Sequence, residues 1–71
     1  MEMLQRAITT IEHYNNGNLT KKETIAEFQF LALAYFECGK IGLAKANSLI
    51  THIYEWGKGE ITNSELIRRF A

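Results

Sequence analysis

Few side chains in this sequence are of the types that carry out catalysis or bind transition metals. The single cysteine, Cys38, and the two histidines, His13 and His52, are far apart along the chain. A cysteine nucleophile needs a base, an orienting group and an oxyanion site. The sequence offers a nucleophile in Cys38 and a base in His52, but no orienting group and no oxyanion site. Neither histidine has a partner at metal-site spacing. We expect no enzyme and no cofactor, and Cys38 as a buried structural thiol.

A turn motif that occurs twice is a candidate calcium site. Gly-x-[Leu/Ile]-Thr-x-x-Glu runs from Gly17 to Glu23 and again from Gly59 to Glu65. It resembles the EF-hand loop, with glycine at position six and glutamate at position twelve. The other ligand positions fall on Glu12, Tyr14 and Asn16 in the first copy and on Tyr54, Trp56 and Lys58 in the second. Aromatic rings and an ammonium group cannot replace oxygen ligands, so we expect no metal, and the glutamates fit capping boxes instead.

The segments around these turns have apolar residues at the 3.6-residue period of a helix. The pattern predicts helices over residues 2–15, 20–38, 41–56 and 63–71, with glycines ending the first three. The side chains expected to face inward are Met3, Leu4, Ala7, Ile8, Ile11 and Tyr14, then Ile25, Phe28, Leu31, Ala32, Tyr35 and Phe36, then Leu43, Ala46, Leu49, Ile50, Ile53 and Trp56, and finally Leu66, Ile67 and Phe70.

The chain also contains an internal repeat. Residues 8–28 recur as residues 50–70, at an offset of 42. Identical residues stand at Ile8/Ile50, Thr9/Thr51, Ile11/Ile53, Gly17/Gly59, Thr20/Thr62, Glu23/Glu65, Ile25/Ile67 and Phe28/Phe70. Each copy is a helix, a glycine turn and a second helix. The sequence therefore predicts one all-α domain of four helices, built of two pseudo-repeated hairpins (1–38 and 41–71) that pack on each other.

Composition restricts the class of partner. The 71 residues include eight basic and eight acidic side chains, whereas nucleic-acid binders usually carry a basic excess. One cysteine allows no intramolecular disulfide, which favours a reducing compartment. The start of the chain lacks an apolar signal core, and the most apolar stretch, residues 28–36, is too short to span a bilayer. We expect a soluble cytoplasmic protein without a membrane contact.

Residues 41–56 are nevertheless a candidate DNA-reading helix. The short turn before this segment and its polar side chains fit a helix-turn-helix, whose second helix enters the major groove. The groups that would contact nucleic acid are Lys40, Lys45, Asn47, Ser48 and His52. The balanced charge argues against this function, and an ordinary solvated helix face explains the same residues.

The helix over residues 20–38 has more apolar surface than a single packed face requires. A second apolar strip with a charged rim consists of Ala26, Glu27, Phe30, Leu33, Ala34 and Glu37. This strip is either covered by another helix of the chain or exposed. An exposed aromatic side chain with a charged rim is typical of a binding surface. We take the strip as the candidate partner-binding site, with Phe30 as its anchor.

The segment YNNGNLTKKETIAEFQFL combines a tyrosine, a glycine turn, a Leu-Thr pair, an acidic helix start and aromatic positions. In these features residues 11–33 resemble short, mostly uncharacterised bacteriophage proteins. The matching positions are Tyr14, Gly17, Leu19, Thr20, Glu23, Ile25 and Phe28. The chain departs from the pattern at Asn15 and Asn16, where an acidic residue is common, and at Lys21 and Lys22. The resemblance implies a small phage or mobile-element product, and it carries over no functional residue.

Small phage products of this kind frequently bind host proteins stoichiometrically, as inhibitors of host defences such as anti-CRISPR proteins do. From this resemblance and the strip on residues 20–38, we expect a non-enzymatic protein that binds and inhibits or modulates a host protein complex. It would act in the host cytoplasm if it is phage-encoded. Two alternatives stay open: a small dimeric DNA-binding regulator that uses residues 41–56, and a self-assembling structural subunit whose partner is a second copy, as in a homodimer.

Overall fold

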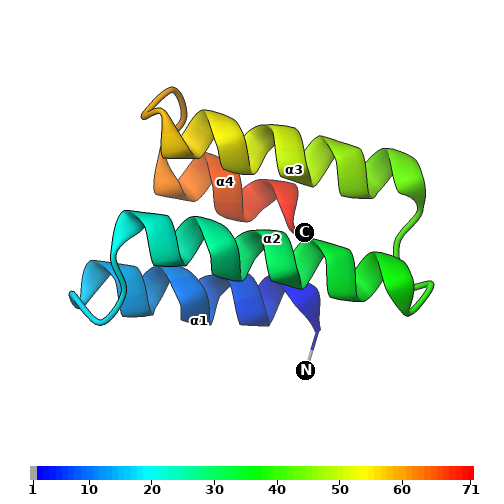
Figure 1. Cartoon of the computed structure of the whole chain (residues 1–71), viewed down its shortest axis with the longest axis horizontal. Coiled ribbons are helices and arrows are strands. Elements are labelled where there is room, and N and C mark those ends of the chain that lie inside the picture. Colours follow the sequence, from blue (N-terminus) through cyan, green and yellow to red (C-terminus); the bar gives the residue numbers. More distant parts are fainter. Residues whose placement is uncertain (1) are drawn as a thin grey trace.

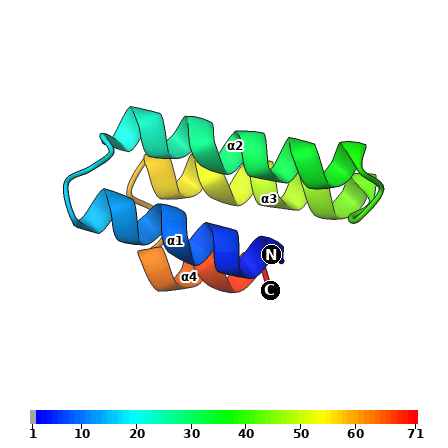
Figure 2. The ribbon, with the colours of Figure 1, turned by 90° about the horizontal axis from the view of Figure 1, so that it is seen from below.

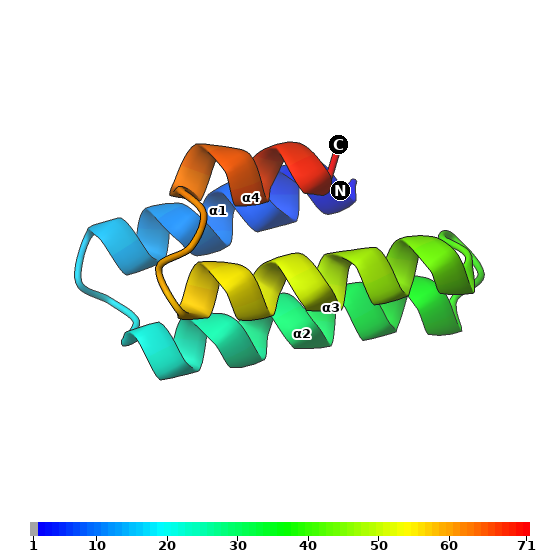
Figure 3. The same cartoon turned by 90° about the horizontal axis from the view of Figure 1, so that it is seen from above.

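The computed structural model describes residues 2–71, which form four α-helices joined by short turns (Figure 1). They are α1 (Met3–Asn15), α2 (Lys21–Glu37), α3 (Leu43–Gly57) and α4 (Asn63–Arg69). Each helix packs against the next, and α1 also packs against α4. Figures 2 and 3 show α2 and α3 side by side as one layer, with α1 and α4 as the other. The predicted all-α fold is confirmed, with helix bounds within two residues of those expected.

Residues that are equivalent in the repeat contact each other in the core. The rings of Tyr14 and Trp56 lie edge to face with centroids 5.3 Å apart. The rings of Phe28 and Phe70 lie 5.4 Å apart. Phe28 also meets Trp56 at 5.6 Å, which joins the two pairs. Because both pairs of equivalents meet, the two hairpins are related by an approximate two-fold axis through this aromatic cluster.

All three turns have the same hydrogen-bonded geometry. At each turn a glycine with positive φ follows the helix, and its N–H and the next N–H bond back to the last helical turn, as in a Schellman motif. The glycines are Gly17, Gly39 and Gly59, with φ of 79°, 72° and 79°. The 6→1 bonds are Asn18 N–H to His13 C=O, Lys40 N–H to Tyr35 C=O and Glu60 N–H to Glu55 C=O, each 2.9 Å. The turn at Gly39 therefore has the same geometry as the other two. The internal repeat did not predict this likeness, because it includes only the turns at Gly17 and Gly59.

Capping boxes start α2 and α4, as predicted. The Thr20 N–H donates to Glu23 Oε1 at 2.8 Å, and the Glu23 N–H donates to Thr20 Oγ1 at 3.1 Å. The Thr62 N–H and Glu65 make the same pair of bonds at 2.9 and 3.1 Å. The N-cap of α3 is instead Gly42, which has no side chain to accept a hydrogen bond. The carboxylates that a calcium loop would use are thus engaged at helix N-termini.

We predict that Thr62→Ala lowers the free energy of unfolding by roughly 1 kcal/mol, as loss of an N-cap typically does. The effect should appear first as fraying of α4, because a seven-residue helix depends on its cap and its packing. Amide exchange should therefore accelerate in residues 64–70. Thr51→Ala is the control, because the exposed Thr51 hydroxyl only bonds back to the Asn47 carbonyl. Unchanged protection in residues 64–70 of Thr62→Ala would contradict the role of the cap.

The second capping box also predicts a pH dependence. Hydrogen bonds from the backbone and side chain of Thr62 hold the pKa of Glu65 below its ordinary value. Since the folded pKa is depressed, the stabilisation is fully present above the unfolded pKa of roughly 4.3 and is lost as pH falls through the folded value. Carbonyl chemical shifts of α4 should move toward coil values below that pH. Glu65→Gln should remove this pH dependence. If the carbonyl shifts of α4 changed with pH in the same way in the wild-type protein and in Glu65→Gln, the prediction would be contradicted.

The core lies between the two layers and consists mainly of the residues expected to face inward. Those buried are Met3, Ala7, Ile11, Phe28, Ala32, Ala46, Leu49, Ile53, Trp56, Leu66 and Phe70. One polar residue, Thr24, is fully buried too, and its hydroxyl donates to the Thr20 carbonyl at 2.7 Å. The apolar pattern did not predict that Thr24 would be buried, because threonine is polar. Its burial is tolerated since the hydroxyl bonds back to the carbonyl one turn earlier and leaves no donor unpaired.

Three predicted burials are wrong, and all three lie at one end of the bundle. Leu43 is 62% exposed, Phe36 is 37% exposed, and Cys38 is exposed. The turn between α2 and α3 extends beyond the start of α1 and the end of α4 (Figure 1). Because α2 and α3 have 17 and 15 residues and α4 only seven, the apolar periodicity continues past the point where a neighbour can cover it.

Candidate interaction surface

The apolar strip predicted on α2 is open in the folded chain. Phe30 is 75% exposed and Leu33 is 51% exposed, whereas Phe28 between the core helices is fully buried. Of the other four strip residues, Ala26, Glu27 and Glu37 are exposed and Ala34 is half-buried. Neither α1 nor α3 covers the strip. A large aromatic ring therefore stands in solvent near the middle of the central helix.

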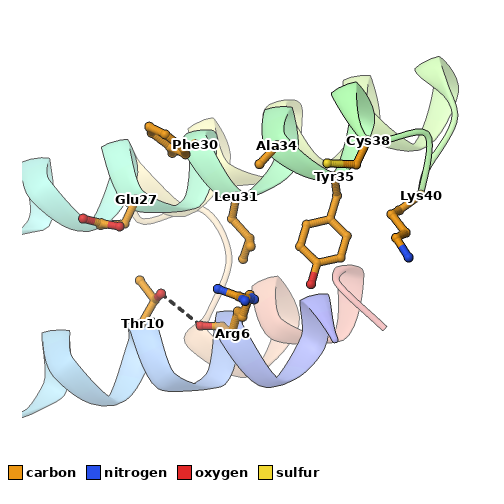
Figure 4. Close-up of a pocket in the computed structure, with 9 residues that line it drawn as sticks. All are labelled: Arg6, Thr10, Glu27, Phe30, Leu31, Ala34, Tyr35, Cys38 and Lys40. Atoms are coloured by element: carbon orange, nitrogen blue, oxygen red, sulfur yellow. Dashed lines mark hydrogen bonds between the residues drawn. The ribbon is translucent and has the colours of Figure 1, made fainter. Parts of the chain in front are cut away.

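A groove runs along one side of this strip, between α2 and α1. It has a volume of about 550 Å³. Its lining residues are Arg6 and Thr10 from α1, Glu27, Phe30, Leu31, Ala34, Tyr35 and Cys38 from α2, and Lys40 from the following turn (Figure 4). Three strip residues, Glu27, Phe30 and Ala34, thus form part of the α2 wall of the groove. The sequence pattern missed the α1 side, because nothing local to α1 shows which α2 residues it will face.

The groove is mostly apolar on its α2 side and polar on its α1 side, with further charges at its ends. Leu31 and Tyr35 project from α2 toward Arg6 and Thr10 of α1 (Figure 4). Glu27 lies near one end of the groove and Lys40 near the other. Within residues 2–71, neither of these two side chains forms an ion pair. Both can therefore pair with charges on a molecule that lies along the groove.

Exposed hydrophobic side chains are concentrated on one layer of the molecule. In the described chain, the large ones are Phe30, Leu33 and Phe36 on α2 and Leu43 and Tyr54 on α3. The outer sides of α1 and α4 have no comparable residue within this range. The α2/α3 layer is thus the side of the bundle with uncovered apolar surface.

The residues proposed for nucleic-acid contact do not form a free basic surface. The Lys45 Nζ donates to the carbonyl oxygens of Arg69 and Ala71 at 2.8 and 3.1 Å, which fixes the end of α4 to α3. The ring Nδ1 of His52 lies 2.6 Å from the Ser48 carbonyl, so this nitrogen carries the proton and donates. Lys40, Asn47 and Ser48 remain exposed. One exposed lysine supplies little of the phosphate attraction on which DNA binding depends.

The potential catalytic and metal-binding residues stay apart. Cys38 lies at the end of α2 and lines the groove, and His52 lies within α3 with its Nε2 3.9 Å from Glu55. In the part of the chain that the structure describes, no group of three or more histidine, cysteine, aspartate or glutamate side chains is placed to hold a metal ion.

The comparisons do not assign the chain to a family. No family model, curated protein or solved structure matches it. Over residues 2–71, none of the helices combines the length and apolarity that crossing a membrane requires.

Proposed function

We propose that this chain is a non-enzymatic interaction module that binds another protein through the α2 strip and the adjoining groove. The exposure of Phe30 carries the proposal. A 75% exposed aromatic ring at mid-helix contributes little to the core and, unless it has a partner, invites aggregation. Aromatic anchors surrounded by polar rims are where binding energy concentrates in protein interfaces, and Glu27 and Glu37 supply such a rim.

The groove beside Phe30 supports the same proposal. Its apolar wall can take the side chain of a partner, and the opposite charges of Glu27 and Lys40 at its ends can orient that partner. In its specific form, the proposal follows the resemblance to phage proteins. The partner is then a host protein complex that the chain inhibits or modulates by stoichiometric binding in the host cytoplasm, as an anti-CRISPR protein does.

Site-specific photo-crosslinking in cells tests the proposal. A photoreactive phenylalanine analogue at Leu33, beside Phe30, should give a discrete adduct with a protein other than a second copy of this chain. The same analogue at Asn47, exposed on α3, is the matched control and should give none. Adding Phe30→Ala to the chain that carries the analogue at position 33 should reduce the yield of the adduct at least tenfold. Equal labelling from both positions, or an adduct that Phe30→Ala leaves unchanged, would contradict a binding site on α2.

A further inference from the structure

The charges along the exposed side of α2 oppose the dipole of the helix. Lys21 and Lys22 lie in its first turn, Glu37 is its last residue, and its last turn contains no basic side chain. Cations near a helix N-terminus and anions near a C-terminus are unfavourable. Lys21 lies over the Trp56 ring at 4.6 Å, and Glu23 is used in the capping box, so Lys22 and Glu37 are the exposed charges at the two ends of α2 without a local role.

A second copy of α2 that runs antiparallel would match both charges. Placing Lys22 opposite Glu37 of the second copy brings Glu37 opposite its Lys22 by the same symmetry. Each helix N-terminus then receives a carboxylate and each C-terminus an ammonium group, as the dipoles favour. A parallel arrangement would instead place lysine beside lysine and glutamate beside glutamate.

This register also gives complementary packing. Lys22 and Glu37 are equidistant from the point between residues 29 and 30, so Phe30 lies beside the two-fold axis and meets Phe30 of the second copy. The small Ala26 then lies opposite the large Leu33 of that copy. Ala26, Phe30, Leu33 and Glu37 follow one another at spacings of four, three and four residues, which is the seam of an antiparallel helix pair.

We infer that the free protein is a homodimer in which the α2 strips of two copies pair antiparallel about a two-fold axis at Phe30. The inference rests on the proposed function, because it names an occupant of the same surface. A stable interface buries about 800 Å² on each partner, roughly a sixth of the 4613 Å² surface of this chain. α2 alone is about 25 Å long, and its exposed side carries Phe30 and Leu33 at 75% and 51% exposure.

Sedimentation equilibrium from 5 to 500 µM in low salt tests the dimer. The wild-type chain should dimerise, and Phe30→Ala should raise the dissociation constant by roughly 30-fold or more. Lys22→Glu and Glu37→Lys should each weaken the dimer, and the double reversal should restore it. Each single reversal should also raise the melting temperature of the monomer, because it improves the interaction with the helix dipole. Thr51→Ala, at an exposed position of α3, should leave the dissociation constant unchanged.

The outcomes separate the two proposals. A wild-type chain that stays monomeric at 500 µM overturns self-pairing, and the Leu33 crosslink to another protein still decides the proposed function. A dimer that Phe30→Ala leaves intact, or that the double reversal does not restore, overturns the antiparallel α2 arrangement. Because both reversals lie at exposed positions, they remain informative even if Phe30→Ala proves poorly folded.

Discussion

Phe28→Ala is expected to lower the free energy of unfolding by about 3–5 kcal/mol, whereas Phe30→Ala should change it by less than about 0.5 kcal/mol. Phe28 is fully buried and contacts the rings of Trp56 and Phe70, while Phe30 is 75% exposed on the same helix. Truncation of a buried phenylalanine typically costs 3–5 kcal/mol. A chain of this length has a total stability of roughly 4–10 kcal/mol. The expected loss is therefore a large fraction of the total stability.

Urea denaturation of the two variants, followed by circular dichroism, measures both values under identical conditions. The pair is a matched control, because the same atoms are removed two residues apart on one helix. If Phe30→Ala unfolded the domain to a similar extent, the Phe30 ring would belong to the core in solution. The interaction surface would then have to be sought on the polar side of α3.

The contrast between these two residues was accessible from sequence. In a 3.6-residue period, Phe28 falls on the face that Thr24, Ala32 and Tyr35 share, and Phe30 falls on the opposite face. Whether a neighbour covers that opposite face depends on the positions of α1 and α3, which periodicity does not contain. In the structure no neighbouring helix covers this face, and Phe30 is exposed.

The errors of the sequence interpretation lie where neighbouring helices differ in length. Leu43 continues the three-and-four spacing of Ala46, Leu49 and Ile53, so the pattern predicts burial. The turn that precedes Leu43, however, extends beyond the end of α4 (Figure 1), and Leu43 is left exposed. A local pattern records which face is apolar but not how far its neighbour extends.

The groove between α1 and α2 could not be predicted for a related reason. Its strip half, with Phe30 and Ala34, follows from the surplus of apolar residues on α2. Its other half, with Arg6 and Thr10, depends on the angle at which α2 returns along α1 after the turn at Gly17. The glycine that ends α2 was predicted, but the middle turn lies outside the internal repeat, because Gly42 replaces the threonine that precedes α2 and α4.

Trp56→Ala should be the other severe substitution, because Trp56 links all four helices. Its ring packs on Tyr14 of α1 and on Phe28 of α2. Its Nε1–H donates to Asn63 Oδ1 at 2.7 Å, and the Asn63 amide in turn donates to Asn15 Oδ1 at 3.2 Å. The side chain is 2% exposed, so we expect a cost of about 3–5 kcal/mol and loss of cooperative unfolding.

The polar part of this linkage can be measured separately from the packing part. Asn63→Ala leaves the indole N–H of Trp56 without its acceptor, which should cost roughly 1–3 kcal/mol. In a Trp56→Phe background there is no indole donor, so the same substitution should cost several-fold less. A double-mutant cycle by urea denaturation gives the coupling energy directly. Equal costs in both backgrounds would show that the bond adds no stability to the packing of Trp56.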